Sequence, residues 1–336
     1  MTATEFSHET LHAFLNRELG SAPLSPLERI GGGQSNPTYF LEHGSRRMVL
    51  RKKPAGDILP GAHAIEREYR VLKALEQTNV PVPGTVLLCE DSSIVGTPFY
   101  LMERLEGRVF HDCALTEVDP AQRADIYFAM ADAMARLHAV DPASIGLGDY
   151  GKPGNYFARQ IARWSRQYDE SPSPRIPELD RVIAWLRENQ PEDDGRIAIT
   201  HGDFRLGNML FHPSKPQVIG ILDWELSTLG HPLADLGFCC MPWRTTPDEY
   251  GGIAGLDHAA LRLPSEKAFI ERYYASAIPT AELTAFHLAF AMFRFAVIFV
   301  GIADRARIGN AASADAARLA PLAQRFAIRA AQAASI

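Results

Sequence analysis

The sequence has 336 residues, a formal net charge of −6, 22% charged residues and 46% hydrophobic residues. This composition is typical of a folded protein with enough chain for two lobes, and it argues against a disordered chain. The negative net charge argues against a nucleic-acid-binding surface.

The N-terminal text, "MTATEFSHETLHAFLNREL", has early acidic residues and no basic stretch followed by an apolar one. We therefore expect no secretory signal peptide and a cytoplasmic location. The most apolar segment, residues 288–303, is interrupted by Arg294, so we interpret it as a buried helix rather than a membrane span. The four cysteines lack metal-ligand spacing and are interpreted as reduced, buried thiols: Cys89, Cys113, Cys239 and Cys240.

The first hundred residues predict a small sheet with one main helix. A helical pattern comes first, then a strand-rich stretch broken by a glycine turn at 31–33, and then a helix with one apolar stripe. Two further strands follow. These predicted elements occupy residues 9–19, 27–54, 62–77, 80–91 and 97–107.

The sequence beyond residue 107 has mostly helical patterns. The exception is the block 196–225, where short apolar runs alternate with turn residues. We therefore predict a β-rich lobe over residues 1–104 and a larger helical lobe over 105–336, an α+β fold with a cleft between the lobes where a small ligand can bind. The helical patterns cover residues 119–139, 154–168, 177–189 and 265–333.

The block 196–225 contains a motif that carries chemistry. His201, Asp203 and Asn208 follow the spacing H-x-D-x-x-x-x-N, and Asp223 ends an apolar strand fifteen residues later. Phosphoryl transfer requires a carboxylate at the attacking hydroxyl, oxygen ligands for Mg²⁺ and cations near the phosphates. We expect Asp203 to face the acceptor hydroxyl, Asn208 and Asp223 to bind Mg²⁺, and Arg205 to reach the transferred phosphate. We expect His201 to orient the loop rather than to react.

These residues and their flanks resemble the aminoglycoside phosphotransferase and choline kinase superfamily, which has a protein-kinase-like fold. Within this superfamily, the sequence is most similar to the phosphotransferase domains found beside or fused to acyl-CoA dehydrogenases. The resemblance implies a small-molecule kinase that uses ATP and Mg²⁺. The matching pieces are "VLRKKPAG", "AHAIEREYRVLKAL", "VPVP", "YLMERLEGRVF", "HGDFRLGNMLF", "ILDWELSTLGHPLADLG" and "FRFAVIFVGIADRARIGNAAS".

The resemblance also implies a cation on the third strand that pairs with a helix glutamate. Strand alternation after Val49 favours Arg51 for this role, a departure from the lysine of protein kinases, with Lys52 and Lys53 as alternatives. Glu68 is the expected partner. The alternative partner is the neighbouring Glu66.

Further nucleotide contacts are implied in the first lobe. The glycine turn would cover the phosphates with the backbone of Gly32 and Gly33 and with Ser35. The segment that connects the two lobes, residues 101–107, would bind adenine through the backbone of Glu103 and Leu105. An ordinary hairpin remains the alternative for the glycine turn, since the full GxGxxG pattern is absent.

The acceptor is expected to be a small molecule carrying a hydroxyl. Only eleven residues separate Asp223 from Asp235, too few for the activation segment of a protein kinase, and Asp235 is interpreted as a helix cap that supports the catalytic loop. Basic and aromatic residues of the second lobe suit a carboxylate or phosphate on the acceptor if they line its pocket, although they could equally be capping or surface residues: Arg244, Arg294, Arg305, Arg307, Trp243 and Phe295.

Three functions remain open at this stage. The first is a kinase of a hydroxyacyl-CoA or hydroxy acid, with a functional link to an acyl-CoA dehydrogenase. The second is an antibiotic kinase of the aminoglycoside type, which would need an acidic pocket for its polycationic substrate. The third is a catalytically silent nucleotide-binding module, a reading supported by Arg51 and the incomplete glycine loop.

Overall fold

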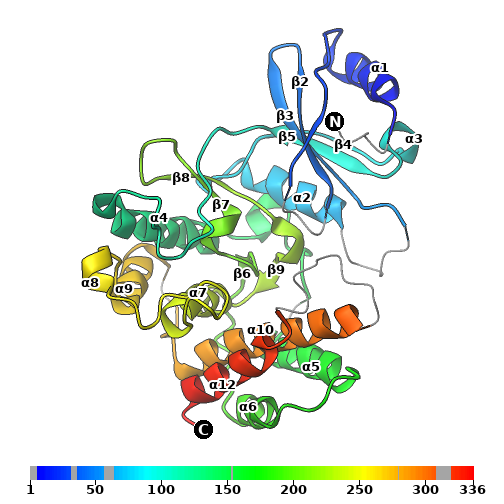
Figure 1. Cartoon of the computed structure of the whole chain (residues 1–336). Helices are drawn as coiled ribbons and strands as arrows, with labels where there is room; N and C mark the ends of the chain where they lie inside the picture. Colours follow the sequence, from blue (N-terminus) through cyan, green and yellow to red (C-terminus); the bar gives the residue numbers. More distant parts are fainter. Residues whose placement is uncertain (1–5, 32–35, 57–63, 153, 279, 308–318) are drawn as a thin grey trace.

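The structure is a computed structural model that describes residues 6–31, 36–56, 64–152, 154–278, 280–307 and 319–336. It has two lobes, a small one built on a sheet and a larger helical one, as expected (Figure 1). The sheet ends at Glu103, and the chain then passes into the helical lobe.

A five-stranded antiparallel sheet forms the small lobe, in the order β1-β2-β3-β5-β4. The hairpin β2–β3 is closed at Gly44, whose φ of +61° suits glycine. Three helices accompany the sheet: α1 (His8–Leu19), α2 (Ile65–Leu75) and α3 (Ser92–Val95). The strands are β1 (Glu28–Arg29), β2 (Thr38–His43), β3 (Arg46–Lys52), β4 (Thr85–Cys89) and β5 (Phe99–Glu103).

Strand alternation gives the two faces of β3 different roles. Leu50 belongs to the buried cluster that includes residues of α1, and Lys52 follows it on that face. Val49 and Arg51 lie on the other face, on the side of α2. Strand alternation predicted that Arg51 lies on the same face of the strand as Val49, and this prediction is correct. The alternation also explains why Arg51 points towards the cleft.

Two short two-stranded sheets hold the motif block in the second lobe. β6 (Ala198–Thr200) pairs with β9 (Thr228–Gly230), and β7 (Met209–Phe211) pairs with β8 (Val218–Ile221). The motif loop leaves β6 and enters β7, while β8 leads to Asp223. The pairing continues past the strands, because Leu222 N–H donates to the Asn208 carbonyl at 2.8 Å.

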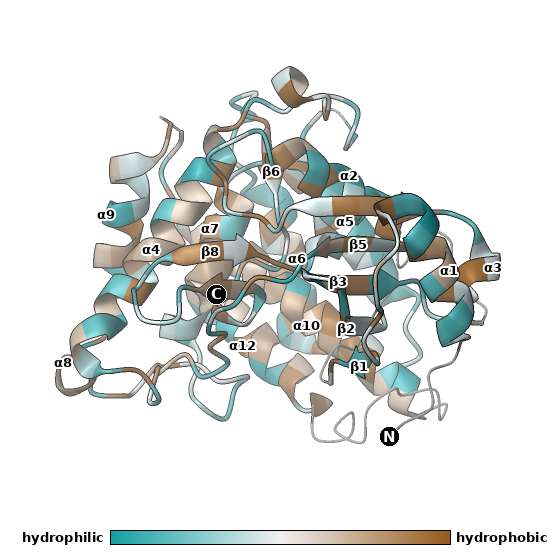
Figure 2. Ribbon diagram, turned by 90° about the horizontal axis from the view of Figure 1, so that it is seen from above, coloured by the Kyte–Doolittle hydropathy of each residue, from teal (hydrophilic) through white to brown (hydrophobic). Residues whose placement is uncertain are grey.

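Helices form the rest of the second lobe. α10 packs against α5, α6, α7 and α12, and its apolar colouring is visible in Figure 2. α10 is long and apolar enough to cross a membrane, but 78% of its most apolar window is buried in the protein, which agrees with the predicted buried helix. The helices are α4 (Pro120–Ala139), α5 (Tyr156–Asp169), α6 (Pro177–Glu188), α7 (Leu233–Cys239), α8 (His258–Leu261), α9 (Glu266–Ser276), α10 (Ala285–Arg307) and α12 (Leu322–Ala334).

The expectation that all four cysteines are buried needs correction, and some predicted nucleotide contacts lie outside the described residues. Cys113 is only half-buried, unlike the other three cysteines, because it lines a pocket. The predicted phosphate contacts Gly32, Gly33 and Ser35 lie outside the described residues.

Candidate active site

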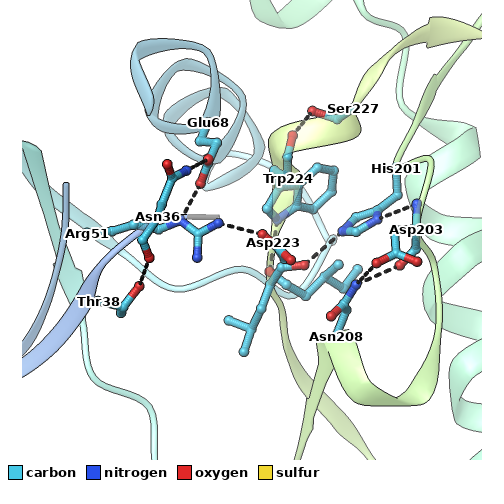
Figure 3. Close-up of polar contacts among 12 residues, drawn as sticks. Asn36, Thr38, Arg51, Glu68, His201, Asp203, Asn208, Asp223, Trp224 and Ser227 are labelled. Atoms are coloured by element: carbon cyan, nitrogen blue, oxygen red, sulfur yellow. Dashed lines mark hydrogen bonds and ion pairs between the residues drawn. The ribbon is translucent and has the colours of Figure 1, made fainter. Parts of the chain in front are cut away.

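The motif loop brings Asp203, Arg205 and Asn208 together. Asn208 donates its Nδ2 to the Asp203 carbonyl at 2.9 Å and to Asp203 Oδ2 at 2.7 Å. Arg205 donates Nε to the same Oδ2 at 3.2 Å. The contacts with Asn208 are drawn in Figure 3. The Asp203 carboxylate is thereby fixed through one oxygen, and its side chain stays 22% exposed.

His201 uses both ring nitrogens to hold backbone groups. Its Nε2 lies 2.8 Å from the Leu222 carbonyl, and its Nδ1 lies 3.2 Å from the Asp203 N–H. These contacts require a neutral ring that carries its proton on Nε2. The residue is buried, so it orients the loop rather than reacting, as the sequence predicted.

Asp235 supports the motif loop by accepting hydrogen bonds from its backbone. Its carboxylate accepts the N–H groups of His201 at 2.7 Å and of Gly202 at 2.9 Å, and it lies 3.3 Å from His138 Nε2. Burial alone would raise its pKa, but the hydrogen bond and charge of His138 and the loop contacts lower it. Asp235 supports the loop as predicted, but it lies within α7 and does not cap it, because the helix begins after Pro232.

Arg51 bridges the two lobes. Its Nε lies 2.8 Å from Glu68 Oε2, and its Nη2 lies 2.5 Å from Asp223 Oδ1 (Figure 3). Glu68 also accepts hydrogen bonds from Asn36 Nδ2 at 2.7 Å and from Tyr100 Oη at 3.2 Å. The pair predicted from the sequence is therefore present. Burial raises the pKa of Glu68 even though Arg51 lowers it.

The two neighbouring lysines point elsewhere. Lys52 is buried and donates to the Val95 carbonyl at 2.6 Å. Lys53 pairs with Glu66 at 2.5 Å. Both alternatives to the Arg51–Glu68 pair are thus engaged away from it.

Asp223 combines an unusual backbone conformation with an accessible carboxylate. It adopts a left-handed backbone with φ of +65°, which is uncommon for a residue other than glycine. Its side chain is 32% exposed. With Asn208, it offers the oxygen donors that Mg²⁺ prefers. Among the described residues, no group of three or more His, Cys, Asp and Glu side chains could hold a metal ion, so these two residues would need phosphate oxygens to complete a magnesium site.

The connector offers fewer free backbone groups than expected. The N–H of Glu103 donates to the Gly84 carbonyl at 2.7 Å. An adenine could therefore use the Glu103 carbonyl but not its amide. Leu105 packs towards β8, where a Cβ on Gly220 would lie 2.9 Å from its Cδ1.

A pocket adjoins the motif loop. Four consecutive loop residues, 204–207, form part of its wall, and most of the remainder is apolar or aromatic. The polar exceptions include Arg205 and Glu249, and Glu249 is paired with Arg329 at 2.9 Å. The lining consists of His111, Cys113, Tyr127, Met130, Phe204, Arg205, Leu206, Gly207, Phe238, Cys239, Met241, Pro242, Thr245, Glu249, Tyr250, Gly252, Phe295 and Phe326.

The arginines considered for the acceptor pocket do not line it; among the set predicted from the sequence, only Phe295 does. Arg244 makes two hydrogen bonds to Glu266, at 2.8 and 2.9 Å. Arg294 is buried and donates to the Gly202 carbonyl at 3.0 Å. Arg307 donates to Ser173 at 2.9 Å. Trp243 and Arg305 are also absent from the lining.

Sequence reasoning missed Tyr250 and His111 as pocket residues. No motif surrounds either of them, and each reaches the pocket through a loop whose path depends on distant contacts. The left-handed backbone of Tyr250, with φ of +65°, has a faint signal in the two glycines that follow it.

Comparisons with known proteins identify the family to which the chain is similar. The phosphotransferase enzyme family matches residues 26–288. Acyl-CoA dehydrogenase family member 10 of Mus musculus is 41% identical over 325 residues, which cover 95% of this chain and 30% of that protein. Family member 11 of Gallus gallus is 40% identical over 321 residues, which cover 92% of this chain and 41% of that protein. The chain thus spans less than half the length of these relatives.

Solved structures of phosphotransferases have a similar fold. A protein of Ralstonia eutropha, named as a candidate aminoglycoside phosphotransferase, has a TM-score of 0.88 and 45% identity, with 98% of each chain covered. The aminoglycoside phosphotransferase APH(4)-Ia, in a ternary complex with AMP-PNP and hygromycin B, has a TM-score of 0.64 and 16% identity, with 96% of this chain and 98% of that chain covered. At that identity the second likeness supports the fold alone.

Proposed function

We propose that this chain, which belongs to the phosphotransferase enzyme family, transfers the terminal phosphoryl group of ATP to a hydroxyl group of a small molecule. The observation that carries the proposal is the convergence of Asp203, Asn208 and Asp223 at the cleft, with Arg51 reaching Asp223 from the other lobe. Phosphoryl transfer uses groups of these kinds: a carboxylate at the attacking hydroxyl, oxygen ligands for the metal and a cation at the phosphates.

The catalytic loop supplies the groups for the acceptor side. Asp203 would accept a hydrogen bond from the acceptor hydroxyl through the oxygen that Asn208 and Arg205 leave free, and so orient it for attack. Arg205 is held at Asp203, and from there it would stabilise charge on the transferred group.

The nucleotide would lie between the lobes. Arg51 would contact its phosphates while remaining paired with Glu68, and the Glu103 carbonyl and Leu105 would face the adenine. Asn208 and Asp223 would hold Mg²⁺, which neutralises phosphate charge when bound. The phosphate contacts of Gly32, Gly33 and Ser35 remain part of the proposal.

The apolar pocket favours a hydroxyacyl acceptor, such as a hydroxyacyl-CoA or a hydroxy acid. An acyl chain gains free energy by leaving water for such a lining. A polycationic aminoglycoside would require several free carboxylates, whereas Glu249, the single carboxylate among the described lining residues, is already paired with Arg329. The names of the curated relatives support a functional link to an acyl-CoA dehydrogenase. The cytoplasmic location expected from the sequence stays a prediction.

An ADP-release assay with Mg-ATP tests the proposal. The acceptors are hydroxyacyl-CoAs, free hydroxy acids, choline-like alcohols and aminoglycosides. We expect turnover of the hydroxyacyl class, a loss of kcat of at least about 100-fold in Asp203→Ala, and retained Mg-ATP binding. Asp125→Ala, at an exposed aspartate of α4, is the matched control.

Other outcomes separate the alternatives. Turnover of aminoglycosides alone would replace the acceptor class. A different outcome would be that the protein turns over none of these acceptors, while both variants bind Mg-ATP with wild-type affinity. That outcome would favour a silent nucleotide-binding module and contradict the proposal.

A further inference from the structure

One wall of the pocket is a loop, residues 245–254, that is closed on itself. Ala254 N–H donates to the Thr245 carbonyl at 2.8 Å, and Gly252 N–H donates to the Thr246 carbonyl at 3.1 Å. A Cβ on Gly252 would lie 1.9 Å from the Thr245 carbonyl oxygen, so the neck of the loop closes only around glycine. The tip of the loop is therefore presented from two fixed ends.

The C-terminal helix holds the same loop from the side. Glu249 is 8% exposed and pairs with Arg329 of α12 at 2.9 Å. Its neighbour Asp248 pairs with Arg325, one turn earlier on that helix. These contacts fix the position of the residue that follows them.

That residue, Tyr250, is strained and half-exposed. Its φ is +65° and its exposed fraction is 47%. A bulky side chain rarely adopts the left-handed backbone, and such strain is kept mainly at functional sites. The ring makes edge contacts with Phe295 and Phe299 of α10, each at 5.5 Å between centroids. The fold holds a large apolar ring over a pocket while leaving half of it in solvent.

Tyr250 also lies close to the catalytic loop. Burial tends to lower the pKa of Arg205, but Asp203 and then Tyr250 are the leading groups that raise it. Both Arg205 and Tyr250 line the pocket. The tyrosine therefore packs its ring against α10 and lines the same pocket as Arg205 of the catalytic loop.

We propose that Tyr250 determines acceptor specificity by covering the apolar part of the acceptor against Phe295, with the hydroxyl end directed to Asp203. This inference rests on the proposed function and deepens it. Each additional methylene group beneath the ring leaves water, so the benefit of the tyrosine grows with the length of the acyl chain. A short acceptor that does not reach the ring gains little from it.

Three variants separate this role from a structural one. Tyr250→Phe keeps the ring. Tyr250→Ala removes it and keeps the backbone strain, whereas Tyr250→Gly removes both. The measurements are the melting temperature of each variant, its KM and kcat for short-, medium- and long-chain hydroxyacyl-CoAs, and calorimetric binding of the long-chain compound in the presence of AMP-PNP and Mg²⁺.

We expect the glycine variant to melt at a higher temperature than the alanine variant, yet both to raise KM for the long-chain acceptor about tenfold or more and for the short one much less. The phenylalanine variant keeps the wild-type order of acceptors. If glycine restores acceptor affinity along with stability, or if KM changes equally at all chain lengths, the tyrosine is structural and the inference is wrong. Wild-type protein that binds Mg-ATP but no acyl compound would overturn the inference and the hydroxyacyl acceptor class together. An alanine variant that melts no lower than the glycine variant would overturn the strain argument, whatever the acceptor.

Discussion

Arg51 contacts two carboxylates whose surroundings differ. Glu68 is 1% exposed and Asp223 is 32% exposed. Removing the guanidinium leaves the first carboxylate buried, with Asn36 and Tyr100 as its remaining partners among the residues that the structure describes, while solvent can reach the second. The cost of the deletion should therefore come mainly from Glu68.

We predict that Arg51→Ala lowers the free energy of unfolding by up to about 3 kcal/mol and weakens ATP binding. Arg51→Lys should keep more stability but still raise the KM for ATP, because one ammonium group cannot contact both carboxylates and the phosphates at once. Chemical denaturation and ATP titration measure the two effects. The control is Arg46→Ala at an exposed position of the same strand. An Arg51→Ala protein as stable as the wild type would show that the bridge contributes nothing to folding.

Residue-level reasoning from the sequence succeeded where local periodicity decides a direction. Strand alternation placed Arg51 on the same face as Val49 and made it the first choice over Lys52. The structure agrees, because Arg51 pairs with Glu68 while Lys52 donates to the Val95 carbonyl. The same reasoning could not find Tyr250, because its position depends on a loop closed by the Thr245–Ala254 pair and held by α12. It also left open whether Arg244 lines the pocket, because the sequence does not show that Glu266 is its partner.

At the scale of elements, α10 begins with a buried histidine. His287 stacks on His231, with ring centroids 6.1 Å apart, and its Nδ1 lies 3.0 Å from the Thr284 N–H. Burial, with a smaller contribution from His231, lowers the pKa of His287 to about 4, although Asp194 opposes the shift. In the unfolded chain a histidine titrates near its ordinary value of about 6.5.

We predict a loss of stability on acidification from this site. The unfolded chain takes up a proton at higher pH than the folded protein does, so the contribution of His287 is complete above pH ~6.5 and declines as the pH falls towards 4. The decline amounts to at most about 3 kcal/mol. His287→Phe should flatten the dependence of melting temperature on pH over this interval. Parallel curves for the variant and the wild type would contradict the prediction.

The predicted and observed elements agree best where a pattern is long. The helix expected at 177–189 is found at Pro177–Glu188, because an apolar stripe over three turns is unambiguous. β9, with the three residues Thr228–Gly230, was not predicted. So short a strand carries no periodicity, and it exists because β6 is beside it.

At the scale of the whole molecule, the proposed nucleotide site draws on both lobes. Arg51 and Glu68 come from the first lobe, and Asn208 and Asp223 from the second, with one ion pair, Arg51–Asp223, joining the two sets. A ligand that contacts all four residues must stabilise the lobes together. Binding would then appear as a change in the unfolding of the entire chain rather than of one part.

We predict that saturating Mg-ATP raises the melting temperature of the chain by a few degrees, because a ligand present at about 100 times its Kd adds about 2.7 kcal/mol to the folded state. Removing the metal with EDTA should abolish most of this shift, since Asp223 and the phosphates would then repel each other. Asp223→Ala should behave as wild-type protein in EDTA does, whereas Asp125→Ala should keep the full shift. Differential scanning calorimetry measures all four cases. A shift of equal size with and without Mg²⁺ would mean that the nucleotide binds without the metal that Asn208 and Asp223 are proposed to hold.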